Sequence, residues 1–126
     1  MKKIFLLSFI YLTVFINSIT AQITWTGTTS SDWNTASNWS SNSVPTSSDD
    51  VILPDVTTDP VLGSAADVCQ NLEIRSGAVL TSNDASYKLT AATIDLQSGG
   101  QISFSAGEIE CTGKMDCDGN LTMGGS

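Results

Sequence analysis

Three tryptophans, Trp25, Trp33 and Trp39, are the side chains in this sequence whose type and spacing best suit a binding function. They lie close together in a chain in which aromatic residues make up only 7%. Indole rings with polar neighbours can stack on sugar rings, which would make the segment a glycan-binding module. The rings can equally plug the end of a hydrophobic core, where each buries about 150–250 Å². The sequence favours the plug and leaves glycan contact as the alternative.

Cysteine chemistry is the second candidate, because the chain has three cysteines, Cys69, Cys111 and Cys117. Cys111 and Cys117 occupy equivalent apolar positions in neighbouring sequence phrases. They are either small apolar core residues or the two halves of a disulfide, if their Cα atoms come within about 4.4–6.8 Å. Cys69 is left over in both cases.

The carboxylates are the third candidate. A glycosidase needs two carboxylates that face each other across a cleft, but Glu108 and Glu110 are two apart and would point the same way along one strand. Asp116 and Asp118 alternate as calcium ligands do, but the glycine and glutamate that an EF-hand loop requires are not in register. The chain has no histidine, so a Ser-His or Cys-His pair cannot form. We therefore predict no catalytic, cofactor-binding or metal-binding residues and expect no enzyme activity.

Short strands must position all of these side chains. From Ile94 onward the chain consists of apolar-polar-apolar phrases, and a glycine closes each of them; these glycines are Gly100, Gly107, Gly113, Gly119 and Gly125. Alternation turns one face of a strand inward, and regularly spaced glycines indicate corners where the backbone turns sharply. Short strands with corners at a fixed period are typical of a β-solenoid.

The rest of the chain agrees with an all-β fold. Apolar runs near residues 51–53, 68–74, 78–80 and 87–89 predict further strands, and the mature chain shows no convincing helical periodicity. We predict a parallel β-solenoid (β-helix) of roughly three to four coils over residues 50–126, preceded by a Trp-rich capping segment over residues 22–49. The last residues are the middle of a phrase, which predicts a C-terminally truncated fragment. Alternatively, the open end pairs with a partner or with another copy, end to end.

The first 21 residues have the order of a secretory signal peptide, which would form a helix. Lys2 and Lys3 precede an apolar run over residues 4–16, which is too short to span a bilayer as a helix, and we expect cleavage after Ala21. Loss of the two lysines would take the formal net charge from −8 to −10, so a nucleic-acid partner is excluded. The expected location is secreted or cell-surface, with no membrane span after cleavage.

Two segments resemble a known class of proteins. The stretch Trp-Thr-Gly … Asp-Trp-Asn-Thr-Ala-Ser-Asn-Trp-Ser … Val-Pro-Thr-Ser-Ser-Asp-Asp-Val-Ile-Leu-Pro, from Trp25 to Pro54, resembles the start of large exported bacterial surface proteins. The segment from Asn71 to Thr81 is similar to the same class. Its members resemble parallel β-helix adhesins and commonly end in a type IX secretion sorting domain. These 126 residues contain no such domain, which agrees with a fragment.

The resemblance implies a non-catalytic surface or adhesive structural protein, with a host or matrix glycan or protein as its partner. The alternative is a glycan-binding module that uses Trp25, Trp33 and Trp39. A third and more remote alternative is a fragment of a polysaccharide-active β-helix enzyme.

Overall fold

The computed structural model describes residues 22–124, and within them nearly all regular structure is β-strand. The predicted signal helix over residues 1–21 lies outside the described residues, as does Gly125. The elements, in chain order, are β1 (Gln22–Thr24), a short 3-10 turn η1 (Ala36–Asn38), β2 (Asp50–Leu53), β3 (Asp67–Ile74), β4 (Val79–Leu96), β5 (Gln101–Cys111), β6 (Met115–Cys117) and β7 (Asn120–Met123). Within residues 22–124, no helix has the length and apolar composition needed to cross a bilayer.

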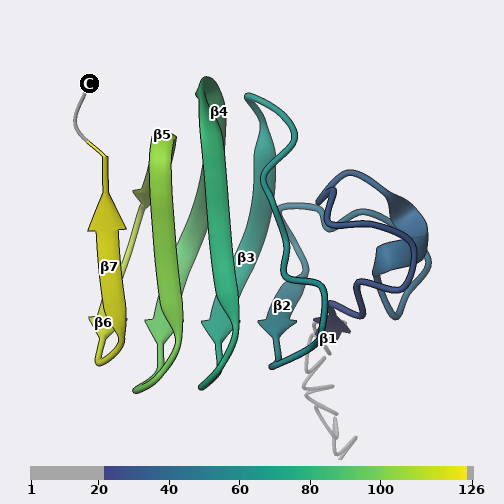
Figure 1. Ribbon diagram of the computed structural model, residues 1–126, viewed down its shortest axis with the longest axis horizontal. Helices are drawn as coiled ribbons and strands as arrows, with labels where there is room; N and C mark the ends of the chain where they lie inside the picture. Colours follow the sequence, from purple (N-terminus) through teal and green to yellow (C-terminus); the bar gives the residue numbers. More distant parts are fainter. Residues whose placement is uncertain (1–21, 125–126) are drawn as a thin grey trace, which may run out of the picture.

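All pairings between named strands are parallel, as a solenoid requires. In the register of the sheet, Val51 lies beside Leu72, Leu72 beside Ile94 and Ile94 beside Met115, so each coil takes 21 or 22 residues. Figure 1 shows the strands side by side, with residues 25–49 folded against the β1 end of the stack and β6 and β7 at the other end. The fold is the predicted parallel β-solenoid, with about three coils.

Each coil has three faces. Face A consists of β1, β2, residues 71–74 of β3, residues 93–96 of β4, and β6. Face B consists of residues 79–83 of β4, residues 101–106 of β5, and β7. Face C consists of residues 67–69, 88–91 and 108–111 of β3, β4 and β5.

Glycines form corners between these faces, as the sequence predicts. Gly107 turns β5 from face B to face C at φ +102°, and Gly77 and Gly99 also have positive φ, a conformation that side chains with a Cβ disfavour. Not every corner ends a strand, however, and residues 22–124 form seven strands. The parallel pairing of β4 with β5 continues past their shared corner, with register shifts near Asn83, so two long strands replace several short ones.

Columns of inward side chains fill the coils. Leu53, Ile74 and Leu96 form one such column, with none of them more than 1% exposed. Burial of one such side chain contributes about 1.5–3 kcal/mol. The columns become accessible toward β7, where Leu121 and Met123 are 39% and 43% exposed. The core is thus covered at the β1 end and exposed at the β7 end.

Candidate functional site

The three tryptophans form a single buried cluster at the β1 end of the solenoid. Trp39 lies in the middle, with its ring centroid 4.9 Å from that of Trp25 and 4.7 Å from that of Trp33, and both contacts are edge-to-face. Edge-to-face pairs bring the positive edge of one ring to the negative face of the next, which adds about 0.5–1.5 kcal/mol per pair to the burial energy. The exposed fractions are 1% for Trp25, 0% for Trp33 and 2% for Trp39.

Two of the three indole N–H groups are hydrogen-bonded. Trp25 Nε1 donates to the carbonyl oxygen of Thr58 at 2.8 Å, and Trp39 Nε1 donates to the carbonyl oxygen of Trp33 at 2.8 Å. Trp33 Nε1 is buried and has no hydrogen-bond partner among the described residues. The cluster thereby connects the capping segment to the loop that follows β2.

Asn38 holds the loop around this cluster, and sequence reasoning did not single it out. Its side-chain oxygen accepts hydrogen bonds from the backbone N–H groups of Thr29 and Ser30, both at 2.9 Å. Its amide nitrogen donates to Ser30 Oγ at 3.0 Å and to the carbonyl oxygen of Asp32 at 2.9 Å. One buried side chain therefore satisfies a turn that would otherwise leave backbone groups unpaired. The sequence signal for it is weak, because it is one of two asparagines, Asn34 and Asn38, between the second and third tryptophans.

The capping segment also closes the edge of β1. Ser40 donates its backbone N–H to the carbonyl oxygen of Thr24 at 2.9 Å, and Ser40 Oγ accepts from the Thr24 N–H at 2.9 Å. An open edge would be a template for a further strand, so this contact prevents head-to-tail stacking of copies through Thr24.

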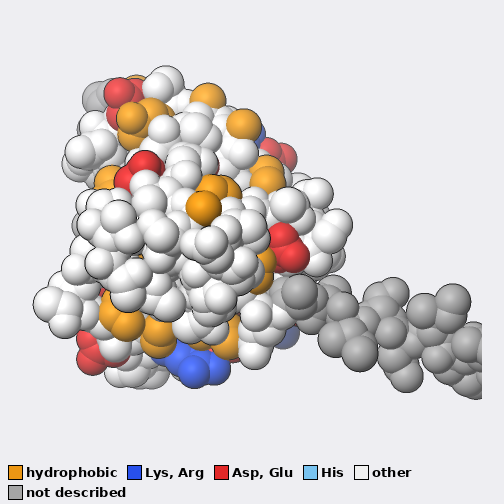
Figure 2. All heavy atoms as spheres, turned by 90° about the vertical axis from the view of Figure 1, so that its right-hand side faces the viewer, with side chains coloured by type: hydrophobic (Ala, Val, Ile, Leu, Met, Phe, Trp, Pro, Cys, Tyr) orange, Lys and Arg blue, Asp and Glu red, His pale blue; other side chains and the backbone are white. Residues whose placement is uncertain are grey.

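The cluster is therefore a plug, and glycan contact through the tryptophan rings is not supported. Sugar stacking requires an exposed ring face, and none of Trp25, Trp33 and Trp39 is more than 2% exposed. Figure 2 shows this end of the molecule from outside, where most of the surface is backbone and uncharged polar side chains. The ring faces point inward because their edge-to-face packing covers the hydrophobic core.

The structure contains no disulfide between Cys111 and Cys117. Both are free thiols, as is the buried Cys69. Cys69 and Cys111 lie on face C, in register with Ala91 between them, whereas Cys117 lies on face A beside Leu96. The sequence placed Cys111 and Cys117 in equivalent phrases, but those phrases belong to different faces of one coil. Burial, with a smaller contribution from the charge of Asp50, raises the pKa of the Cys69 thiol to about 12.

Glu108 and Glu110 point the same way, as the sequence predicts, and both contact Lys88. Lys88 Nζ lies 2.6 Å from Glu110 Oε2 and 3.4 Å from Glu108 Oε1. The hydrogen bond to Glu110 is the main reason why the pKa of Lys88 lies above its ordinary value. Two carboxylates on one exposed strand do not face each other across a cleft, so the geometry of a glycosidase is not met here. Among residues 22–124, no group of three or more Asp, Glu, Cys or His side chains is arranged to hold a metal ion.

A groove on the outside of face A is the candidate site that sequence reasoning missed. It has a volume of about 230 Å³ and crosses β1, β2, β3 and β4 along the stacking direction of the coils. Its walls are two rows of outward side chains, which we name the amide row and the carboxylate row. The amide row, named after its central residue Asn71, is Asp50, Asn71 and Thr93. The carboxylate row, named after its two acidic residues, is Ile52, Glu73 and Asp95.

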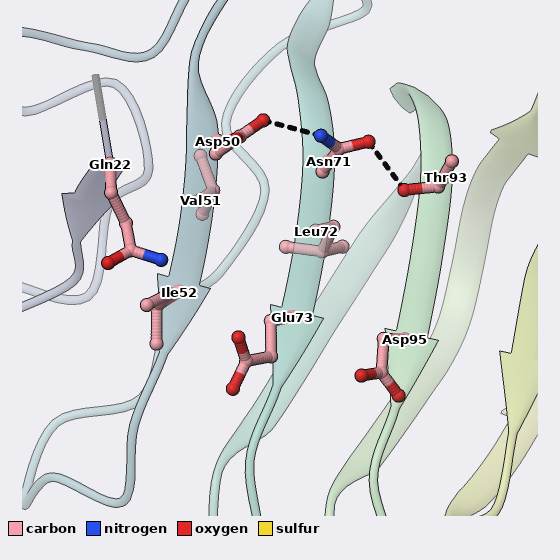
Figure 3. A pocket seen from close by; sticks show the side chains of 9 residues that line it. All are labelled: Gln22, Asp50, Val51, Ile52, Asn71, Leu72, Glu73, Thr93 and Asp95. Atoms are coloured by element: carbon pink, nitrogen blue, oxygen red, sulfur yellow. Dashed lines mark hydrogen bonds between the residues drawn. The ribbon is translucent and has the colours of Figure 1, made fainter. Parts of the chain in front are cut away.

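The two rows are visible in Figure 3, with Val51 and Leu72 between them. Neighbouring strands lie about 4.7–4.9 Å apart, and residues two apart in a strand lie about 6.6 Å apart. The groove is therefore a narrow channel whose polar groups repeat at the strand spacing. No local motif predicts it, because its residues are 21 or 22 positions apart in the sequence and meet only when the coils stack.

Hydrogen bonds hold the groove's side chains in place. Asn71 Nδ2 donates to Asp50 Oδ1 at 2.6 Å, and Thr93 Oγ1 donates to Asn71 Oδ1 at 2.6 Å (Figure 3). Glu73 Oε1 accepts from Arg75 Nε at 2.7 Å. These hydrogen bonds fix the side-chain positions in the walls of the groove without a ligand.

Comparison with known proteins identifies a family. A family model described as a domain of unknown function (DUF8693) matches residues 24–121. The match covers the Trp cluster and nearly all of the solenoid together. Neither a curated protein nor a solved structure matches the chain.

Proposed function

We propose that this chain, which belongs to the DUF8693 family, is a non-catalytic structural protein that is exported and acts as a rigid surface or adhesive module. The observation that supports this most directly is the filled interior of the solenoid. Inward columns of Ile and Leu side chains occupy the coils, and the Trp cluster covers the β1 end. Recognition therefore has to occur on the outer faces, as it does in solenoids that present extended binding surfaces.

The export part of the proposal is supported by the sequence of residues 1–21, with two lysines, an apolar run and a small residue at position 21. The resemblance of residues 25–54 and 71–81 to exported bacterial β-helix surface proteins agrees with it. On that basis the chain is the N-terminal part of a larger surface protein, and residues 22–124 serve as its capped first coils.

The non-catalytic part of the proposal is supported by the carboxylates. Glu108 and Glu110 share Lys88 on face C, and Asp116 pairs with Lys114 at 2.6 Å. The two carboxylates of a glycosidase face each other across a cleft, whereas these carboxylates lie on exposed strands and bind neighbouring lysines. This arrangement serves solubility and surface charge better than acid catalysis.

The experiment that tests the proposal is to express the gene in a bacterial host with its own leader and to fractionate the cells. We expect the protein outside the inner membrane, with Gln22 as its first residue in intact-mass spectrometry. A chain that remains in the cytoplasm and keeps residues 1–21 would refute the export proposal. A separate assay for new reducing ends in a panel of polysaccharides tests the non-catalytic part, and an activity that Glu110→Gln abolishes would refute it.

A further inference from the structure

The groove on face A differs from the outer surfaces of the other two faces in its charge. On face B the outward residues in register are uncharged; they are Val79, Thr81, Gln101, Ser103, Asn120 and Thr122. On face C, Glu108 and Glu110 share one lysine. Face A carries four outward carboxylates, Asp50, Glu73, Asp95 and Asp116, in two adjacent rows. Arg75 pairs with Glu73 and Lys114 pairs with Asp116, so four carboxylates and two cations leave this face with a net charge of −2.

The size of the groove limits what can fill it. A pocket that encloses a small-molecule ligand usually has about 300–1,000 Å³, and this groove has about 230 Å³. These dimensions fit one long side chain inserted from a partner's surface better than a whole sugar or nucleotide.

The hydrogen-bonding groups of the groove determine which charge that side chain should carry. Asp95 makes no hydrogen bond or ion pair within residues 22–124, although the nearby Lys114 ammonium interacts with it electrostatically. In Glu73, Oε1 accepts from Arg75 and Gln97, while Oε2 has no protein donor among residues 22–124. Two acceptor groups lie in register on adjacent strands, so the ligand must bring donors and gains most if it is cationic.

A second copy of this chain cannot be the donor. Residues 22–124 contain three cationic side chains, and each of them already pairs with a carboxylate of its own chain; the pairs are Arg75 with Glu73, Lys88 with Glu110, and Lys114 with Asp116. The chain as a whole carries a net charge of −8, so two copies repel each other. The partner must come from a different and basic protein.

We propose that the face A groove is a docking site for an extended basic segment of a partner protein. The segment places a Lys or Arg side chain between the amide row and the carboxylate row, with its charged head at Glu73 and Asp95. This inference rests on the proposed surface role and specifies its partner. Docking of this kind is weakened by salt, because the charges remain close to solvent.

The test measures the binding of a labelled peptide of alternating lysine and threonine to the purified protein, in the form that the host cells deliver, by fluorescence anisotropy. Asp95→Asn removes one acceptor charge at the groove and should weaken binding about five-fold, the upper range for a partly exposed ion pair. Asp118→Asn is the matched control. It makes the same chemical change at an exposed residue between β6 and β7, outside the groove, and should leave the affinity unchanged.

Three results would overturn the inference. If Asp118→Asn weakens binding as much as Asp95→Asn, the peptide responds only to net charge. If the lysine peptide does not bind, or binds no better than a peptide with glutamate in place of lysine, the groove does not select cations. If a neutral cellohexaose binds and loses affinity with Asp95→Asn while the lysine peptide does not bind, the partner is a glycan. None of these results depends on export, so they are distinguishable from a failure of the proposed function.

Discussion

The unequal hydrogen bonding within the Trp cluster yields a prediction that can be worked out from the geometry. Trp25 and Trp33 are a matched pair: each is fully buried, and each packs edge-to-face on Trp39. They differ in one respect, because Trp25 Nε1 is bonded to the carbonyl oxygen of Thr58, and Trp33 Nε1 has no partner among the described residues. Substitution of each by phenylalanine removes the indole N–H and a similar volume.

The two variants should therefore share the packing cost and differ in the polar contribution. Trp25→Phe loses a hydrogen bond with a net value of about 0.5–1.5 kcal/mol. Trp33→Phe instead removes a buried donor without a partner, which relieves a desolvation cost of about 1–3 kcal/mol. We expect Trp33→Phe to be the more stable variant by about 2 kcal/mol. Trp39→Phe should be the least stable of the three, because Trp39 contacts both other rings and donates to the Trp33 carbonyl.

The assay is urea unfolding followed by far-ultraviolet circular dichroism, since the substitutions alter tryptophan fluorescence itself. With a urea m-value of about 1–3 kcal/mol/M, a difference of about 2 kcal/mol separates the midpoints of Trp25→Phe and Trp33→Phe by roughly 1 M. Equal midpoints, or a lower midpoint for Trp33→Phe, would refute the argument that an unsatisfied donor distinguishes the two rings.

Four further predictions concern Asn38, the corner at Gly107 and the cysteines. Asn38→Ala leaves the backbone N–H groups of Thr29 and Ser30, in a partly exposed loop, without their acceptor. At about 1 kcal/mol for each group and about 4–8 °C per kcal/mol, thermal unfolding should occur at least about 8 °C lower. A smaller shift would mean that water replaces the side chain. Gly107→Ala places a Cβ at a residue with a φ of +102° and against Ser82 Oγ, which should destabilise the fold by about 1–3 kcal/mol. Adding Ser82→Ala should recover only the part of this loss that is due to the clash. If Gly107→Ala left stability unchanged, the argument that this corner requires glycine would be refuted. Iodoacetamide at neutral pH should modify the exposed Cys117 and spare the buried Cys69, as mass spectrometry can show. Because burial raises the pKa of Cys69 from 9.0 to about 12, its contribution to stability is complete below pH 9 and is lost as the pH rises toward 12; Cys69→Ala should flatten that part of the decline, and an unchanged slope would refute it.

Prediction of the fold from the sequence succeeded where local pattern alone decides the structure. The alternating phrases after Ile94 and the glycine corners indicated a parallel β-solenoid, and the structure has coils of 21 or 22 residues. The ends of the strands could not be predicted in this way, because a corner such as Gly107 turns the chain without ending its hydrogen bonding to the next coil. Periodicity in the sequence indicates which way a side chain points, but it does not indicate where the hydrogen bonding between two strands ends.

The inward-facing side chains can be identified from the sequence, because alternation in a strand depends only on a residue and its immediate neighbours. Their contact partners depend on how the coils stack. The tertiary structure turned the faces of Trp25, Trp33 and Trp39 inward as a plug, and it placed Cys111 and Cys117 on different faces of the solenoid. It also assembled the face A groove from residues of four strands. Each of these outcomes depends on the register between coils, and hydrogen bonds between residues about 21 positions apart set that register.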